Sequence, residues 1–235
     1  SYQNNVKKIV SISTNLNKIE KIKGLSNKNK DVFFTVGTHP NEVLKDDNNS
    51  NYILFSKIST DKKCVGIGEC GLDYHYGKDC KDVQKKSFIT QINVARDTNL
   101  PLIIHARDAD IDMINILEDE FKKGSFRAIL HCFSSGRELA QCGLNLGFYI
   151  SFSGIVTFKS AKNIQNIAKI VPSDKILVET DAPYLAPTPL RGTVNEPKNC
   201  YYTAKFLSEL RECDYEKFTD QLYTNSITIF NKITL

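Results

Sequence analysis

Histidines and carboxylates stand at the ends of several short apolar runs in this chain of 235 residues. His105 ends the run PLIIH, His131 lies in AILHCF and Glu69 lies in GIGEC, while Glu179 and Asp181 end the run ILVETD. Imidazole and carboxylate groups are ligands of zinc, manganese and magnesium ions in proteins. The same kinds of group at the same point of several runs predict a site for divalent metal ions.

Each of these residues also has a purely structural interpretation. A strand-end histidine such as His105 is often satisfied by hydrogen bonds, and Asp181, before an Ala-Pro pair, can cap a turn. A nucleophilic pair of Cys132 and His131 is disfavoured, because neighbouring residues of a strand point to opposite faces. The joint pattern over several runs favours the metal site over these single-residue interpretations.

The apolar runs alternate with amphipathic stretches, which predicts an α/β protein. Helical periodicity is clear over residues 82–99 and 112–122. Near-continuous apolarity is typical of parallel strands buried on both faces. Seven runs have this character: 8–14, 31–38, 64–69, 102–105, 127–133, 148–153 and 176–181.

Two architectures fit this alternation, a doubly wound open sheet and a (β/α)8 TIM-type barrel. No Gly-rich phosphate-binding turn of the G-x-G-x-x-G or G-x-x-x-x-G-K-[ST] form is present, which favours the barrel. A barrel needs eight strands, so we expect that the first strand precedes Ser1 and is missing from this chain. The carboxyl ends of barrel strands meet at one rim, where the histidines and carboxylates would face one cavity.

Composition narrows the class of protein further. The chain carries 31 basic and 27 acidic residues, a net charge of +4 that is too small to indicate nucleic-acid binding by itself. A basic excess in residues 1–30 fits a solvated face better than a phosphate-binding surface. No apolar run approaches the roughly 20 residues of a membrane span. Seven cysteines without a C-x-x-C pair argue against a disulfide framework, which favours an intracellular protein of the cytoplasm or nucleus.

Six sequence blocks, in this order, resemble the TatD-related deoxyribonucleases, and the resemblance covers nearly the whole chain. The blocks are GTHP (37–40), GIGECGLDYH (66–75), PLIIHARDA (101–109), ILHCFSSG (129–136), VETDAPYLAP (178–187) and RGTVNEP (191–197). The resemblance implies a single metal-dependent hydrolase domain over residues 1–235, a (β/α)8 barrel that cleaves DNA phosphodiester bonds with two divalent ions (Mg, Mn or Zn). DNA is the expected partner, no membrane is involved, and we expect a monomer.

The resemblance also implies ligands for the two ions. Glu69 would bridge them, His105 and His131 would complete the ligands of the second ion, and Asp181 would bind the first. Members of the family open with an H-x-H pair that supplies the remaining ligands of the first ion, and this chain contains no H-x-H. We therefore expect the first metal site to be incomplete and this exact chain to have little activity.

Catalysis would need a water activated by a carboxylate, for which we expect Asp181, with Glu69 as the second catalytic residue. His39 is a candidate for contact with the substrate phosphate or for a structural role before Pro40. Arg107 is a second candidate for phosphate contact, because its guanidinium group offers bidentate hydrogen bonds.

Further candidates line the expected substrate groove. Arg191 would contact phosphate or hold the loop 183–197. Asp73 and Tyr74 would line the groove, with Tyr74 stacked on a base, unless they only pack their loop. Two other functions stay open: a metal-dependent ester or amide hydrolase such as a D-aminoacyl-tRNA deacylase, and a non-catalytic barrel that binds nucleic acid.

Overall fold

The computed structural model describes residues 6–44 and 51–233. Each of its seven strands overlaps one of the seven predicted runs; five are shorter than their runs, whereas β3 and β4 extend beyond them. They are β1 (Ile9–Ser11), β2 (Val32–Val36), β3 (Cys64–Asp73), β4 (Leu102–Arg107), β5 (Ala128–Leu130), β6 (Tyr149–Phe152) and β7 (Ile176–Val178).

Helices follow the strands, as the periodicity predicts. The predicted helices 82–99 and 112–122 are confirmed as α3 and α4, with ends that differ by one or two residues. The α-helices are α1 (Ile19–Lys28), α2 (Tyr52–Ser59), α3 (Lys81–Thr98), α4 (Asp110–Lys123), α5 (Arg137–Asn145), α6 (Lys162–Ile170), α7 (Cys200–Leu210) and α8 (Tyr215–Ile229). Short 3-10 turns lie at Leu16–Lys18, Pro40–Glu42, Lys78–Cys80, Gly154–Thr157 and Pro197–Asn199.

The described residues divide into two compact units, each named here after its central histidine. The His105 unit comprises Lys8–Ile129 and the described residues from Ile229 onward. The His131 unit comprises Leu130–Thr228 with Val6 and Lys7. The single domain inferred from the sequence stays a prediction, and each unit is described by itself.

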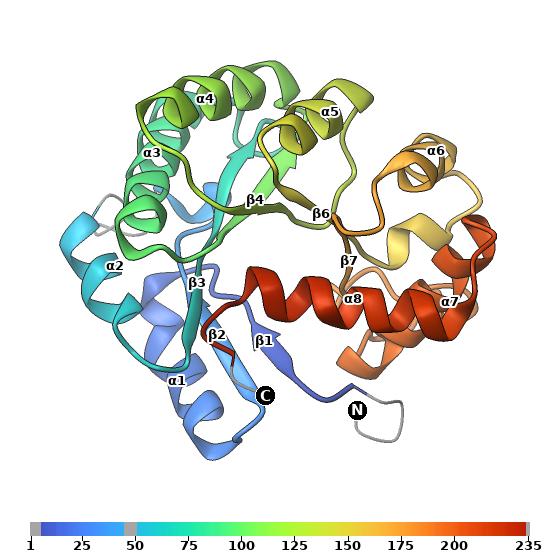
Figure 1. Ribbon diagram of the computed structural model, residues 1–235. Helices are drawn as coiled ribbons and strands as arrows, with labels where there is room; N and C mark the ends of the chain where they lie inside the picture. Colours follow the sequence, from blue (N-terminus) through green and yellow to red (C-terminus); the bar gives the residue numbers. More distant parts are fainter. Residues whose placement is uncertain (1–5, 45–50, 234–235) are drawn as a thin grey trace. The chain divides into compact units, whose positions relative to one another are not determined.

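Strands β1 to β4 of the His105 unit pair in chain order and are all parallel. Helices α1 to α4 lie along one side of them in Figure 1. Phe34 of β2, Phe55 of α2 and Phe88 of α3 are completely buried between these layers. Because all four strands run the same way, their carboxyl ends lie at the same edge of the sheet.

Strand β3 continues four residues beyond the predicted end at Glu69 and reaches Asp73. It pairs with β4 as far as the Asp73–Arg107 position. Gly71 permits this pairing, because a Cβ atom there would lie 2.0 Å from the carbonyl oxygen of His105. Its φ of 137° also lies in the region that favours glycine. The longer strand places the Asp73 side chain at the same edge as His105.

In the His131 unit, β6 and β7 are parallel, with Ile150 paired to Ile176 and Phe152 to Val178. Helix α8 is fastened to this pair by the buried Asn225, whose amide donates to the carbonyl oxygens of Ser173 and Ile176, both at 2.8 Å. The described helices of both units include none that is long and apolar enough to cross a membrane. All seven cysteines are free thiols.

Candidate metal centres

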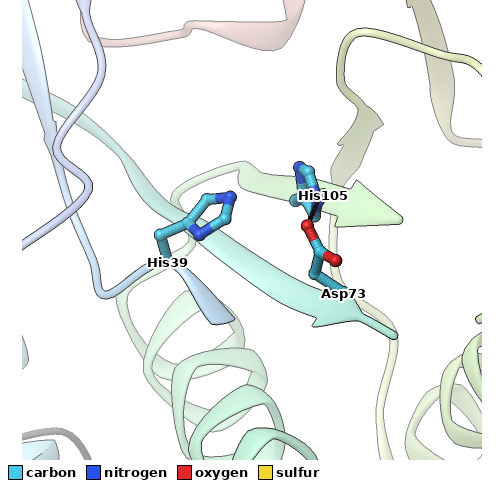
Figure 2. A group of neighbouring side chains, drawn as sticks. All are labelled: His39, Asp73 and His105. Carbon is cyan, nitrogen blue, oxygen red and sulfur yellow. Dashed lines mark hydrogen bonds and ion pairs between the residues drawn. The ribbon is translucent and has the colours of Figure 1, made fainter. Parts of the chain in front are cut away.

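An imidazole ring lies between two carboxylates at the carboxyl ends of β3 and β4. Nδ1 of His105 is 3.1 Å from Oε1 of Glu69, and Nε2 is 3.1 Å from Oδ2 of Asp73. His39 lies beside them, its Nε2 3.5 Å from Oε1 of Glu69, and its ring meets the His105 ring edge to face at 4.5 Å. Figure 2 shows His39, Asp73 and His105 pointing toward one another. We call these four residues the His105 cluster.

His39 is oriented by the backbone that follows it. It caps the 3-10 turn Pro40–Glu42, and its Nδ1 accepts a hydrogen bond of 3.1 Å from the backbone N–H of Asn41. A neutral ring that accepts at Nδ1 carries its proton at Nε2. The Nε2–H therefore faces the carboxylate of Glu69. This arrangement makes His39 a hydrogen-bond donor for an anionic group.

Asp73 is almost fully buried, yet it is held in the charged form. Burial opposes ionisation of its carboxyl group, but the hydrogen bonds from His105, the Tyr76 backbone N–H and Asn41, together with the electrostatic interaction with His105, outweigh it. The pKa of Asp73 is consequently well below its ordinary value. A carboxylate that stays charged inside a protein is a suitable ligand for a cation.

Two buried glutamines of α3, seven residues apart, hold the backbone next to this cluster. The Gln84 side chain accepts from the Asp73 N–H at 2.9 Å and donates to the Asp73 carbonyl at 3.1 Å. The Gln91 side chain accepts from the Thr38 N–H at 3.0 Å and donates to the Thr38 carbonyl at 3.2 Å. Because seven residues are two helical turns, both amides lie on the same face of α3.

The His131 unit repeats the arrangement of one imidazole between two carboxylates. Nδ1 of His131 is 2.9 Å from Oε2 of Glu179, and Nε2 is 3.7 Å from Oδ1 of Asp181. The Ser151 hydroxyl donates to Oε2 of Glu179 at 2.5 Å. The sulfur of Cys132 is 3.8 Å from Oδ2 of Asp181. His131, Glu179 and Asp181 form what we call the His131 cluster.

The expected orientation of Cys132 is wrong. If the strand continued, Cys132 and His131 would point to opposite faces. However, β5 ends at Leu130, and Cys132 has a φ of 44°. Alternation of side chains requires an extended backbone, which is absent at this position. Both His131 and Cys132 therefore contact Asp181.

Asn195 of the RGTVNEP block holds the loop that carries Asp181. Its buried amide donates to the carbonyl oxygens of Thr180 and Tyr184, at 2.8 and 2.7 Å. Arg191 is exposed and lies over the ring of Phe158, 4.3 Å from its centroid. Asn195 thus fixes the backbone next to Asp181, whereas Arg191 packs against Phe158.

The donor atoms of both clusters suit a divalent cation. His39, Asp73 and His105 each offer a ligand atom, and these atoms lie within 4.8 Å of one another. The same holds for His131, Glu179 and Asp181. Within the described residues, the buried Oε1 of Glu179 accepts no hydrogen bond, although it lies 2.8 Å from Nδ1 of His131. A buried carboxylate oxygen that accepts no hydrogen bond is satisfied when it binds a cation.

Two of the predicted substrate contacts look different in the structure. The Tyr74 ring is only 7% exposed, its hydroxyl donates to Asp112 at 2.6 Å, and the Lys81 ammonium group lies over it. This environment fits the packing alternative for Tyr74. Arg107 lies over a different ring, that of Tyr76, at 4.9 Å from the centroid.

Sequence reasoning placed Asp73 among the substrate contacts and left Glu179 out of the ligand set, although both lie in the clusters. A signal for Glu179 exists, because residues two apart at a strand end share a face, and Asp181 follows at that spacing. Of the four predicted ligands, the structure brings Glu69 to His105 and Asp181 to His131. That all four share one pair of ions stays a prediction.

A family model described as TatD related DNase matches residues 1–231. The chain belongs to this family. Similar TatD relatives include the uncharacterized metal-dependent hydrolase YabD of Bacillus subtilis, 39% identical over 199 residues, which are 85% of this chain and 77% of YabD. The uncharacterized metal-dependent hydrolase YcfH of Escherichia coli is 37% identical over 226 residues, which are 96% of this chain and 84% of YcfH.

The fold of the TatD family is confirmed by a solved structure. The crystal structure of YjjV, a TatD homologue from Escherichia coli, superposes with a TM-score of 0.89 at 24% identity. The match covers 97% of this chain and 88% of YjjV. The α/β fold is therefore of the TIM-type barrel class that the sequence predicts, and the TatD family places the chain among metal-dependent hydrolases.

Proposed function

We propose that this protein hydrolyses phosphodiester bonds in DNA with the help of divalent metal ions. The observation that carries the proposal is the ligand set of the two clusters, one imidazole between two carboxylates in each unit. The choice of DNA is supported by the family, whose model is described as TatD related DNase. A phosphodiester is also an anion that the donor groups of His39 and Arg107 would suit.

On this proposal each unit supplies its own ligands. Glu69 and Nδ1 of His105 would hold an ion in the His105 unit, where Asp73 orients the ring from Nε2. His131, Glu179 and Asp181 would hold one in the His131 unit. Mixed nitrogen and oxygen ligands suit Mn or Zn, and the carboxylates with added water also suit Mg. A bound divalent ion supplies Lewis-acid polarisation of a phosphate oxygen and lowers the pKa of a water molecule.

The protein's own side chains bind the substrate and move its protons. The Nε2–H of His39 donates a hydrogen bond to a non-bridging phosphate oxygen. The guanidinium group of Arg107 offers paired N–H donors and supplies a second phosphate contact. Asp181, whose side chain is 31% exposed, is our candidate for the group that takes the proton of the attacking water.

The test is metal-dependent turnover of single-stranded DNA by protein first stripped with EDTA and then supplied with Mg, Mn or Zn. We expect turnover, at the low level that an incomplete first site would give, to return with at least one ion. Replacing Glu69 by Gln or His105 by Ala should lower kcat/KM on the order of 100-fold or more, because the loss of a ligand removes several kcal/mol of transition-state stabilisation.

The matched control is Glu118→Gln, which makes the same charge change at an exposed position of α4 and should leave kcat/KM unchanged. Turnover that survives both EDTA and Glu69→Gln contradicts the metal-dependent mechanism. Hydrolysis of a D-aminoacyl-tRNA without cleavage of DNA would favour the ester-hydrolase alternative. Binding of nucleic acid in EDTA without any turnover would favour the non-catalytic alternative.

A further inference from the structure

Tyr76 presents an aromatic ring to solvent next to the His105 cluster. The residue is 70% exposed and lies in the turn after β3, three residues beyond Asp73. The guanidinium group of Arg107 lies over its ring at 4.9 Å, and the ring of His75 meets it edge-on at 4.7 Å with an interplanar angle of 89°. The Arg107 and His75 contacts together define the orientation of the Tyr76 ring. Most of the surface of this residue stays accessible to solvent.

The backbone of Tyr76 is tied to the cluster through a single carboxylate. Its N–H donates to Oδ1 of Asp73 at 3.0 Å, and Oδ2 of the same group is 3.1 Å from Nε2 of His105. The N–H of His75 also donates to Oδ1 at 3.0 Å, and that of Gly77 donates to the Asp73 carbonyl at 3.2 Å. The turn that carries Tyr76 is therefore fixed relative to His105.

The neighbouring tyrosine cannot take the same role. Tyr74 is buried, its hydroxyl is bound to Asp112, and the ammonium group of Lys81 covers its ring at 4.3 Å. Of the two tyrosines in this loop, Tyr76 is the exposed one. Sequence alone does not distinguish the two, because both are tyrosines in the same turn.

We propose that Tyr76 is a stacking subsite for a nucleobase of single-stranded DNA, with Arg107 holding the ring and facing the adjacent phosphate. The proposal rests on the proposed function, and it names the substrate form that this function would use. Stacking on an aromatic ring accepts every base, since each base has a flat π face. Bases inside a duplex are already stacked on their neighbours, so this subsite favours single strands or frayed ends.

The experiment is a binding measurement in EDTA, where metal-dependent cleavage cannot occur. Fluorescence anisotropy compares a single-stranded oligonucleotide of about ten nucleotides with an abasic strand of the same length and charge. We expect the intact protein to bind the strand with bases on the order of tenfold more tightly, the effect of one stacked base. Tyr76→Ala should abolish that preference, whereas Tyr76→Phe and Tyr76→Trp should keep it.

Tyr223→Ala is the matched control, because Tyr223 is a surface tyrosine of α8 that also carries a cation, Lys7, over its ring. This variant should keep the wild-type preference. The proposal is overturned if Tyr76→Ala still prefers the strand with bases, or if the intact protein binds both strands equally or binds neither at low salt. Tyr76→Phe keeps the aromatic ring, so its comparison with Tyr76→Ala distinguishes a loss of stacking from a loss of folding.

The two proposals fail in different ways. If the protein cleaves no DNA with any metal but shows the Tyr76-dependent preference, the proposed function fails and the stacking subsite stands. If it cleaves DNA and Tyr76→Ala leaves both the preference and KM unchanged, the subsite fails and the proposed function stands. When both hold, Tyr76→Ala raises KM for single-stranded DNA on the order of tenfold with little change in kcat.

Discussion

The charges of single residues in the His105 unit are set by their immediate hydrogen-bond partners. Asp73 is charged in spite of its burial because three kinds of donor converge on it. At Asp112, the ammonium group of Lys85 at 2.8 Å and the hydroxyl of Tyr74 lower the pKa of the carboxyl group. The same contact acts on Tyr74, where burial and then the Asp112 carboxylate raise the pKa of the hydroxyl above its ordinary value.

Replacing Asp112 by Asn should lower the free energy of unfolding near neutral pH by about 1 kcal/mol, because a charge-assisted contact is lost. The pKa of Asp112 is lower in the folded protein than in the unfolded chain, where it is about 3.9. Its contribution is therefore present above about pH 4 and is lost as acid protonates the folded carboxylate. Urea unfolding of both proteins over this pH range measures the difference.

A suitable control is Asp119→Asn, which removes an exposed ion pair with Lys122. It should change stability by less than the Asp112 variant, because exposed pairs contribute little. If the deficit of Asp112→Asn is the same in acid as at neutral pH, the carboxylate is not the stabilising group.

Among the elements, α3 does more than cover the strands. Through Gln84 and Gln91 it fixes the backbone at Asp73 and Thr38, the latter next to His39. Each amide satisfies one buried backbone donor and one buried backbone acceptor. The helix thereby positions two parts of the cluster with a single rigid body.

Replacing Gln91 by Met, which has a similar volume and no amide, should destabilise the protein by about 1–3 kcal/mol, because buried backbone groups of Thr38 are left unpaired. It should also lower kcat/KM through the displaced His39. Urea unfolding and steady-state kinetics on the same preparation measure both effects.

Gln141→Met serves as the comparison, since Gln141 is exposed on α5 and its amide bonds to Asn145. We expect this variant to match the wild type in both measurements. Full stability and activity in Gln91→Met would show that the Thr38 contact does not position the site.

At the scale of the whole molecule, a cation bound only by the folded state stabilises it by mass action. Each unit carries its own cluster, so the stabilisation should have two separable parts. An ion at 100 times its Kd adds about 2.7 kcal/mol per site, which for a chain of this size raises Tm by roughly 5–10 °C.

Thermal unfolding with Mn or Zn, compared with EDTA, measures this shift. His105→Ala and His131→Ala should each remove part of it, and the double variant should remove all of it. Glu118→Gln should show the wild-type shift. An unchanged shift in the double variant would contradict the assignment of both clusters.

The positions of the seven strands, of α3 and α4, and of the histidines at strand ends were predictable, because apolar periodicity and residue type are local properties of the chain. The ordered motifs in the sequence also identify the family. Its periodicity did not predict that β3 continues to Asp73, since that extension depends on Gly71 accepting the close approach of the neighbouring strand.

The tertiary structure alone decided which groups meet. It selected Asp73 and Glu179 as partners of the two imidazoles, buried Tyr74 while exposing Tyr76, and brought the glutamines of α3 to the backbone of the site. These outcomes depend on contacts between segments far apart in the chain and on the turn of each loop. Local patterns encode what an element is, whereas packing determines what each of its side chains faces.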